Sequence, residues 1–223
     1  MSTLFEARNI SFGYDPKKLV LDRVSITIGE GERVGIIGPS GCGKSTLARI
    51  MGGYIASQSP GNSAGYTGEI LFEGKPLARE GYCPVQLVYQ HPERAVNPRW
   101  KMGRTLTEAW QLATKFPTQP DEALLRTMGI EREWFERYPA ELSGGEIQRF
   151  CLARALGPRT RIILADEIST MLDVITQAQI WQALLAITAE RGLGLLVITH
   201  NPHLAEKICS RILKFEDLKS VEN

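Results

Sequence analysis

Residues 38–45 constrain what this chain can fold into more than any other feature of its sequence. They fit the pattern G-x-x-x-x-G-K-[S/T], in which glycines let the backbone wrap closely around anionic oxygens. An apolar strand pattern at 33–37 precedes the pattern and a helical one at 45–51 follows it. Backbone N–H groups at such a strand-to-helix turn form a nest for phosphate. The spacing is not the G-x-G-x-x-G of dinucleotide-binding loops, so the sequence predicts a loop for nucleotide phosphates.

Two side chains of this loop have predicted chemical roles. Lys44 supplies a positive charge for the β- and γ-phosphates, and the hydroxyl of Ser45 can bind Mg²⁺. The alternative is a glycine-rich turn with an incidental lysine, which the strand-loop-helix context disfavours. The other residues that we expect to contact the nucleotide are Gly38, Pro39, Ser40, Gly41, Cys42, Gly43 and Thr46.

A second apolar strand pattern, at 162–165, ends in two acids, Asp166 and Glu167. The strand would place Asp166 near a bound metal, where a carboxylate can hold Mg²⁺ through water. Glu167, one residue on, can polarise an attacking water. Two acids at the end of a strand are often only solvated, but their pairing with the phosphate loop favours the catalytic interpretation.

The segment Ser143-Gly144-Gly145-Glu146 has two possible explanations. Serine followed three residues later by glutamate is a capping box, which needs no ligand. Two consecutive glycines at a helix start are nevertheless costly, unless bare backbone N–H groups are wanted there as an anion receptor. For this segment alone the two explanations are equally good; beside a complete nucleotide site, the receptor is favoured.

Polar residues also follow two other predicted strands. Gln90 comes after the strand at 85–89, and His200 after the strand at 195–199. Either residue could be a plain polar strand end. Because parallel-sheet enzymes place their sites at the carboxyl ends of strands, we expect both to gather with Lys44 and Asp166.

The wider pattern predicts a single α/β domain over residues 1–223. Short alternating runs at 4–28 indicate β-strands with a turn near Asp15 and Pro16, and residues 54–68 indicate a surface loop. The continuously apolar runs at 162–165 and 195–198 are typical of parallel strands covered on both faces. Residues 91–142 hold helical patterns and three of the four tryptophans, and we expect them to form an inserted helical subdomain. Further expected elements are strands at 69–72 and 212–215 and helices at 145–156, 176–190 and 204–208.

Composition excludes several classes of function. The chain has 43% hydrophobic and 23% charged residues with a formal net charge of +1, so it lacks the excess of Lys and Arg that nucleic-acid binding requires. Its four cysteines form no C-x-x-C pair, which indicates reduced thiols in a cytosolic protein. No secretory signal and no apolar run near the ~20 residues of a membrane helix is visible. We therefore expect any work at a membrane to pass through a partner.

Together these motifs resemble those of the nucleotide-binding subunits of ATP-binding cassette (ABC) transporters, over essentially the whole chain. The resemblance rests on the phosphate loop, Gln90, the signature at 142–146, the acidic strand, the run at 169–173 and His200. It implies the ABC ATPase fold of the P-loop NTPases: a mostly parallel sheet core, an antiparallel β edge and a helical subdomain at about 91–142. It also implies ATP hydrolysis with Mg²⁺ as cofactor.

The resemblance implies further roles for single residues. Tyr14 would stack on adenine, Gln90 would contact Mg²⁺ and water, and His200 would hold the γ-phosphate. Asp173 would lie at the seam of a head-to-tail dimer. In that dimer the signature residues Ser143, Gly144, Gly145 and Glu146 would complete the site of the opposite subunit, which is the same chain or a homologous one.

The implied partners are separate permease subunits and, for an importer, an extracytoplasmic solute-binding protein, with this chain on the cytoplasmic face of the membrane. The runs at 88–92, 97–99, 172–174 and 177–180 are similar to the peptide and nickel importer branch. Glu146 stands where the family usually has glutamine, which leaves a heterodimer with unequal sites open. The alternatives are a soluble ABC ATPase without a transport role and a monomeric P-loop kinase or GTPase, which would not need the signature.

Overall fold

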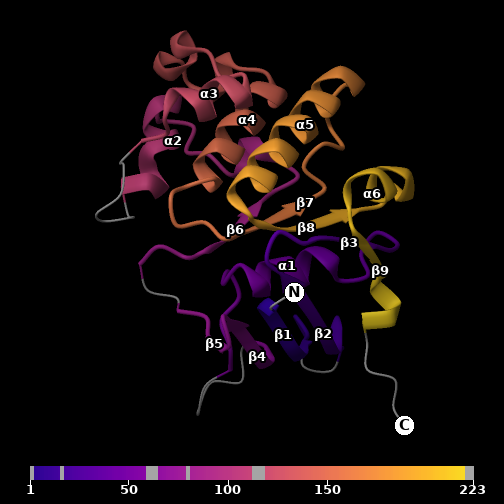
Figure 1. Ribbon diagram of the computed structural model, residues 1–223. Coiled ribbons are helices and arrows are strands. Elements are labelled where there is room, and N and C mark those ends of the chain that lie inside the picture. The colour runs from indigo at the N-terminus through magenta and orange to yellow at the C-terminus, as the bar shows by residue number, and fades with distance from the viewer. Residues whose placement is uncertain (1–2, 16–17, 59–64, 79–80, 112–118, 219–223) are drawn as a thin grey trace. The chain divides into compact units, whose positions relative to one another are not determined.

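The computed structural model describes residues 3–15, 18–58, 65–78, 81–111 and 119–218. The chain forms two compact units, Met1–Arg79 with Gly194–Asn223 and Glu80–Leu193 (Figure 1). Pro16, the middle of the expected loop at 54–68 and residues 112–118 of the expected helical subdomain lie outside the described residues. Each unit has its own sheet strands and its own helices.

The first unit contains an antiparallel sheet in the order β2-β1-β4-β5. Its inward side chains alternate along the strands, and Phe5, Ile10 and Ile28 are fully buried. The two shortest strands of this sheet, β4 and β5, are joined by Glu73 and Gly74. The φ angles of these two residues, 51° and 73°, both lie in the left-handed region that a two-residue hairpin favours. The strands are β1 (Thr3–Phe12), β2 (Leu21–Gly29), β4 (Thr67–Phe72) and β5 (Lys75–Pro76).

The same unit holds three parallel strands, with β3 hydrogen-bonded on one side to β8 and on the other to β9 (Figure 1). β8 is buried along its whole length, as its continuous apolar sequence predicts. Ile37 pairs with Thr199, so β3 and β8 end at the same edge. The elements are β3 (Arg33–Ile37), α1 (Lys44–Met51), β8 (Gly194–Thr199), α6 (Pro202–Ile208), β9 (Arg211–Lys214) and the 3₁₀ turn η4 (Phe215–Leu218).

The second unit is mostly helical around one parallel strand pair, in which Val88, the last residue of β6, pairs with Ala165 of β7. Helix α4 is its centre, with Phe150 fully buried against the rings of Trp134 and Phe135. The elements are β6 (Val85–Val88), η1 (Pro92–Arg94), α2 (Met102–Gln111), α3 (Glu122–Met128), η2 (Arg132–Glu136), η3 (Pro139–Glu141), α4 (Gly144–Ala155), β7 (Ile162–Asp166) and α5 (Val174–Arg191).

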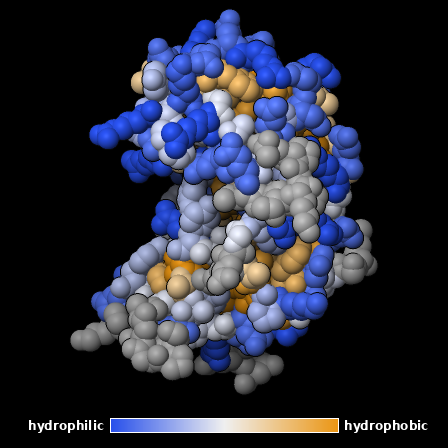
Figure 2. All heavy atoms as spheres, turned by 90° about the vertical axis from the view of Figure 1, so that its left-hand side faces the viewer, coloured by the Kyte–Doolittle hydropathy of each residue, from blue (hydrophilic) through white to orange (hydrophobic). Residues whose placement is uncertain are grey.

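Hydrophilic side chains cover most of the face drawn in Figure 2, with apolar side chains in smaller patches between them. Within the described part of the chain, every helix is too short or too polar to span a lipid bilayer. The larger apolar side chains that reach the surface include Tyr14, which is 63% exposed, and Val174, which is 80% exposed.

Asp121 begins helix α3 and accepts a hydrogen bond from the Leu124 N–H at 2.7 Å. We expect Asp121→Ala to lower the free energy of unfolding by about 1 kcal/mol, because one N–H of the first turn loses its acceptor. Asp121→Asn keeps an acceptor oxygen and should cost less than about 0.5 kcal/mol. Urea denaturation followed by circular dichroism measures both. An equal loss in the two variants would contradict capping as the cause.

Candidate nucleotide-binding site

The phosphate loop lies between the end of β3 and the start of α1, as predicted. Gly41 and Gly43 have φ angles of 78° and 116°, which L side chains rarely adopt. A Cβ at Gly43 would also approach side-chain atoms of Val20, Leu21 and Phe215 to 3.0–3.1 Å. The backbone path of the loop therefore requires glycine at positions 41 and 43, and at Gly43 lack of space requires it as well.

Lys44 is only 5% exposed, although its amine carries a charge. Its Nζ donates hydrogen bonds to the carbonyl oxygens of Gly38 and Pro39, each at 2.8 Å, and lies 3.8 Å from the Cys42 sulfur. The first turn of α1 contains no acidic residue. Two neutral carbonyls thus hold a cation at a helix N-terminus, and charged phosphate oxygens would bind it more strongly.

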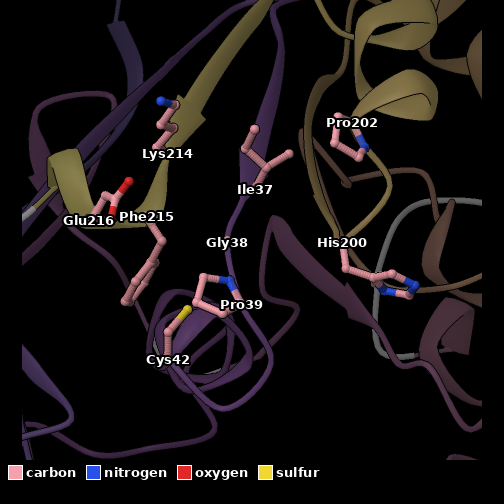
Figure 3. A pocket seen from close by; sticks show the side chains of 9 residues that line it. All are labelled: Ile37, Gly38, Pro39, Cys42, His200, Pro202, Lys214, Phe215 and Glu216. Atoms are coloured by element: carbon pink, nitrogen blue, oxygen red, sulfur yellow. The ribbon is translucent and has the colours of Figure 1, made fainter.

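A cavity of about 530 Å³ adjoins this loop (Figure 3). In Figure 3, His200 lies on the opposite side of the cavity from Lys214 and Glu216, with Pro39 and Cys42 of the loop between them. His200 follows β8, so the shared edge of β3 and β8 brings the predicted histidine beside the predicted loop. The full lining is Ile37, Gly38, Pro39, Cys42, His200, Pro202, Lys214, Phe215 and Glu216.

Tyr14, the predicted adenine-stacking residue, lies near α1. Its hydroxyl is 3.3 Å from the Thr46 hydroxyl, and its ring meets Phe12 edge-on with centroids 4.9 Å apart. Phe12 is buried whereas Tyr14 is 63% exposed. Phe12 therefore supports the edge of an aromatic ring that remains largely open to solvent. Ser45, the predicted Mg²⁺ ligand, is an exposed residue in the first turn of α1.

In the second unit, the predicted acids lie at the end of β7. Asp166 is 6% exposed, and Glu167 has a φ of 49°, an uncommon conformation for a residue with a side chain. The Nε2 atom of Gln90 donates to Glu167 Oε2 at 3.4 Å and to the Thr170 hydroxyl at 3.0 Å. The structure thus brings Gln90 beside Glu167, whereas strand-end position predicts that Gln90 gathers with Lys44 and Asp166. Thr170, which sequence reasoning assigned no role, joins them.

The signature segment begins α4 with a complete capping box. The hydroxyl of Ser143 accepts from the Glu146 N–H at 3.3 Å, and Glu146 Oε2 accepts from the Ser143 N–H at 2.6 Å. The backbone N–H groups of Gly144 and Gly145, between them, take no part in this box. The capping box therefore accounts for Ser143 and Glu146, and the two glycines still need an explanation.

The two signature glycines differ in their surroundings. Gly145 is buried, and a Cβ there would come within 2.8 Å of the Thr176 methyl on α5. Gly144 is exposed, and a Cβ there would meet nothing within 4 Å. Packing between α4 and α5 accounts for Gly145. Nothing in the described part of this chain requires a glycine at position 144.

The turn after Glu167 is fixed to α5 through Ser169, a residue that sequence reasoning assigned no role. Its hydroxyl accepts hydrogen bonds from Gln177 Nε2 at 3.1 Å and Trp181 Nε1 at 3.0 Å. Asp173 then begins α5, accepting from the N–H groups of Ile175 and Thr176. Hydrogen bonds from the Thr176 side chain and backbone hold the pKa of the Asp173 carboxyl below its ordinary value. Asp173 is thus an ionised helix cap.

The predicted site residues therefore form two groups. The first unit brings the phosphate loop with Lys44 beside His200, and the second brings Gln90 beside Glu167. Strand-end position was the signal for Gln90 and His200, whereas the phosphate-loop pattern was the signal for Lys44 and the pair of acids taken with that pattern was the signal for Glu167. The contact of Thr170 with Gln90 depends on the local turn after β7, which no sequence pattern revealed.

A model of the ABC transporter family matches residues 21–170. The nickel import ATP-binding protein NikE of Rhodospirillum rubrum is 35% identical to this chain. The match covers 100% of this chain and 84% of the length of that protein. NikE of Brucella suis is 36% identical, covering 94% of this chain and 80% of its own length.

Among solved structures, the ATP-binding cassette MJ0796, as a dimer in a post-hydrolysis state with ADP and Pi, has a TM-score of 0.80 and 25% identity. The match covers 98% of this chain and 97% of that one. A second dimeric MJ0796 structure, described as a bacterial ABC transporter cassette, has a TM-score of 0.79 and 26% identity, and the match covers 95% of this chain and 94% of that one. The expected ABC ATPase fold is thereby confirmed. The chain belongs to the ABC transporter family, as an ATP-hydrolysing cassette.

Proposed function

We propose that this cassette hydrolyses ATP in a head-to-tail dimer and thereby powers import of a small solute through separate permease subunits. The observation that carries the dimer is Gly144, an exposed glycine at a helix start that nothing in the described part of the chain requires. A glycine with bare backbone N–H at a helix N-terminus suits the close approach of an anion from another molecule. The γ-phosphate held by a second cassette is that anion.

In this proposal Lys44 and the loop amides neutralise the phosphates, His200 contacts the γ-phosphate, and Tyr14 stacks on adenine. Glu167 accepts a proton from the attacking water as its oxygen bonds to the γ-phosphorus and the bond to ADP breaks. Ser143 and Gly144 of the second cassette add donors to the transferred group. Positioning and electrostatics therefore supply most of the catalysis.

Oxygen donors in the chain fit a magnesium ion. The Ser45 hydroxyl, the Asp166 carboxylate and the Gln90 amide oxygen are hard ligands of the kind that Mg²⁺ prefers, and ATP supplies phosphate oxygens as well. The ion would neutralise charge that develops on the β- and γ-phosphates. Asp166, only 6% exposed at the end of β7, would hold it through water.

An apolar surface next to the signature supports a dimer. Met171, Val174 and Ile175 are 65%, 80% and 71% exposed, and they flank the Asp173 cap of α5. The contact between Gly145 and Thr176 places this turn directly beside the start of α4. Apolar side chains gathered beside a proposed contact favour burial against a partner. The resemblance of the dimeric cassettes points to a second ATPase subunit as that partner.

The solute and the remaining partners come from the similarity to nickel import proteins. We infer a nickel complex or a peptide as the solute, a solute-binding protein outside the membrane, and a position of this chain on its cytoplasmic face. The near-neutral net charge of +1 is consistent with protein partners rather than nucleic acid.

The catalytic assignment predicts that Glu167→Gln binds Mg-ATP normally but loses steady-state turnover by at least about 100-fold, because the amide cannot accept the proton of water. ATP should also drive this variant into a stable dimer, since hydrolysis no longer ends the closed state. Phosphate release and size-exclusion chromatography with light scattering measure the two effects. Normal turnover of Glu167→Gln in the assembled complex would reject Glu167 as the base.

The two signature glycines form a matched pair for testing the dimer. In the Glu167→Gln background, Gly144→Ala should fold with a stability at least equal to that of the parent, because its methyl group meets nothing within 4 Å in the described part of the chain and alanine favours a helix over glycine. It should nevertheless weaken ATP-dependent dimerisation about tenfold or more, because the methyl group enters the space of the partner's nucleotide. Gly145→Ala should instead lower the melting temperature through its clash with Thr176. Undiminished dimerisation of Gly144→Ala would contradict an anion contact at this turn.

The transport role predicts solute-stimulated hydrolysis in the complete complex. The chain is purified from its native membrane with its permease and reconstituted into liposomes with the binding protein. A chelated Ni²⁺ complex should raise ATP hydrolysis severalfold, with an oligopeptide as the parallel arm and chelator alone as the control. Stimulation by peptide alone would reassign the solute, whereas recovery of the chain without any membrane partner would contradict a transport role.

A further inference from the structure

Thr170 occupies an unusual place between the proposed base and Gln90. Its hydroxyl donates to the Glu167 carbonyl oxygen at 3.1 Å, and its own N–H donates to the same oxygen at 3.3 Å. A hydroxyl has one proton to donate. Because that proton is used by Glu167, the 3.0 Å contact between Thr170 Oγ1 and Gln90 Nε2 requires the amide to be the donor.

This contact decides which end of the Gln90 amide faces Glu167. The two ends of a glutamine amide have nearly the same shape, so hydrogen bonds alone select between them. Thr170 selects Nε2, which also lies 3.4 Å from Glu167 Oε2. The carboxylate then faces an N–H donor, and the amide oxygen is turned to the other side, where it remains an acceptor.

The residues on both sides of Thr170 are held by backbone conformation and hydrogen bonds. Glu167 is held in the left-handed region with a φ of 49°. On the other side, Ser169 is bound to α5 through Gln177 and Trp181, and the Leu172 N–H donates to the Ser169 carbonyl at 3.2 Å. These contacts hold the turn that presents the Thr170 hydroxyl to Gln90.

We propose that Thr170 is a positioning residue that sets the orientation of the Gln90 amide, so that Nε2 meets Glu167 and the amide oxygen is presented to a divalent cation. The orientation is a property of the chain alone. Its consequence for turnover rests on the proposed function, in which Glu167 is the base and Gln90 contacts Mg²⁺. Removing the hydroxyl would let the amide turn over, with its oxygen facing the carboxylate and its N–H groups facing the cation.

The orientation can be measured without nucleotide by NMR of the Gln90 side-chain amide, assigned through its loss in Gln90→Glu. Thr170→Val removes the hydroxyl at nearly constant shape, and Thr170→Ser retains it. We expect the amide proton shift and its slow solvent exchange to be lost in Thr170→Val and kept in Thr170→Ser. Thr188→Val is the matched control, because the Thr188 hydroxyl donates to Leu185 within α5. An unchanged Gln90 signal in a folded Thr170→Val protein would overturn the proposal.

The kinetic consequence is measured with the assembled complex. Thr170→Val should lower kcat about tenfold, the effect expected for one lost positioning hydrogen bond, with KM for ATP within about twofold. Thr170→Ser should restore kcat, and Thr188→Val should leave it unchanged. A kcat that stays normal while the amide signal changes would overturn the catalytic part of the proposal. Normal turnover of Glu167→Gln would instead reject the proposed base and leave the orientation result standing.

Discussion

The placement of the Lys44 charge underlies the chemistry of the first unit. A lysine amine that is only 5% exposed needs compensation, and the carbonyls of Gly38 and Pro39 supply it at 2.8 Å. These oxygens are available only because the loop bends sharply at Gly41 and Gly43. The loop geometry, the buried charge and the following helix N-terminus therefore depend on one another, and an anion of the right shape would replace two neutral acceptors with stronger ones.

Much of this arrangement could be predicted because its signals are local. The strand at 33–37 was predicted with its exact bounds, and the strand at 162–165 lacked only Asp166. The helix expected to start at residue 176 starts at Val174, because Asp173 caps it and overrides the weak helix propensity of Val174 and Ile175. The two-residue strand β5 was too short to produce a pattern.

The parts of the site that could not be predicted depend on contacts between segments far apart in the sequence. Strand ends predicted that Gln90 would gather with Asp166, but not that Gln90 would contact Glu167 and Thr170 in the turn that follows β7. Likewise, the sequence shows two adjacent signature glycines and cannot separate their roles. The packing of α5 explains Gly145, whereas nothing in the residues that the structure describes explains Gly144.

The capping box and the anion receptor are compatible at the start of α4. The Ser143 oxygen accepts from the Glu146 N–H and so keeps its own proton available to a phosphate oxygen. Glu146 uses one carboxylate oxygen on the Ser143 N–H at 2.6 Å, which holds its negative charge against the helix N-terminus. That charge still opposes an incoming phosphate more than a neutral glutamine would. In the proposed dimer, the same residue that stabilises the helix start would therefore weaken the anion site there.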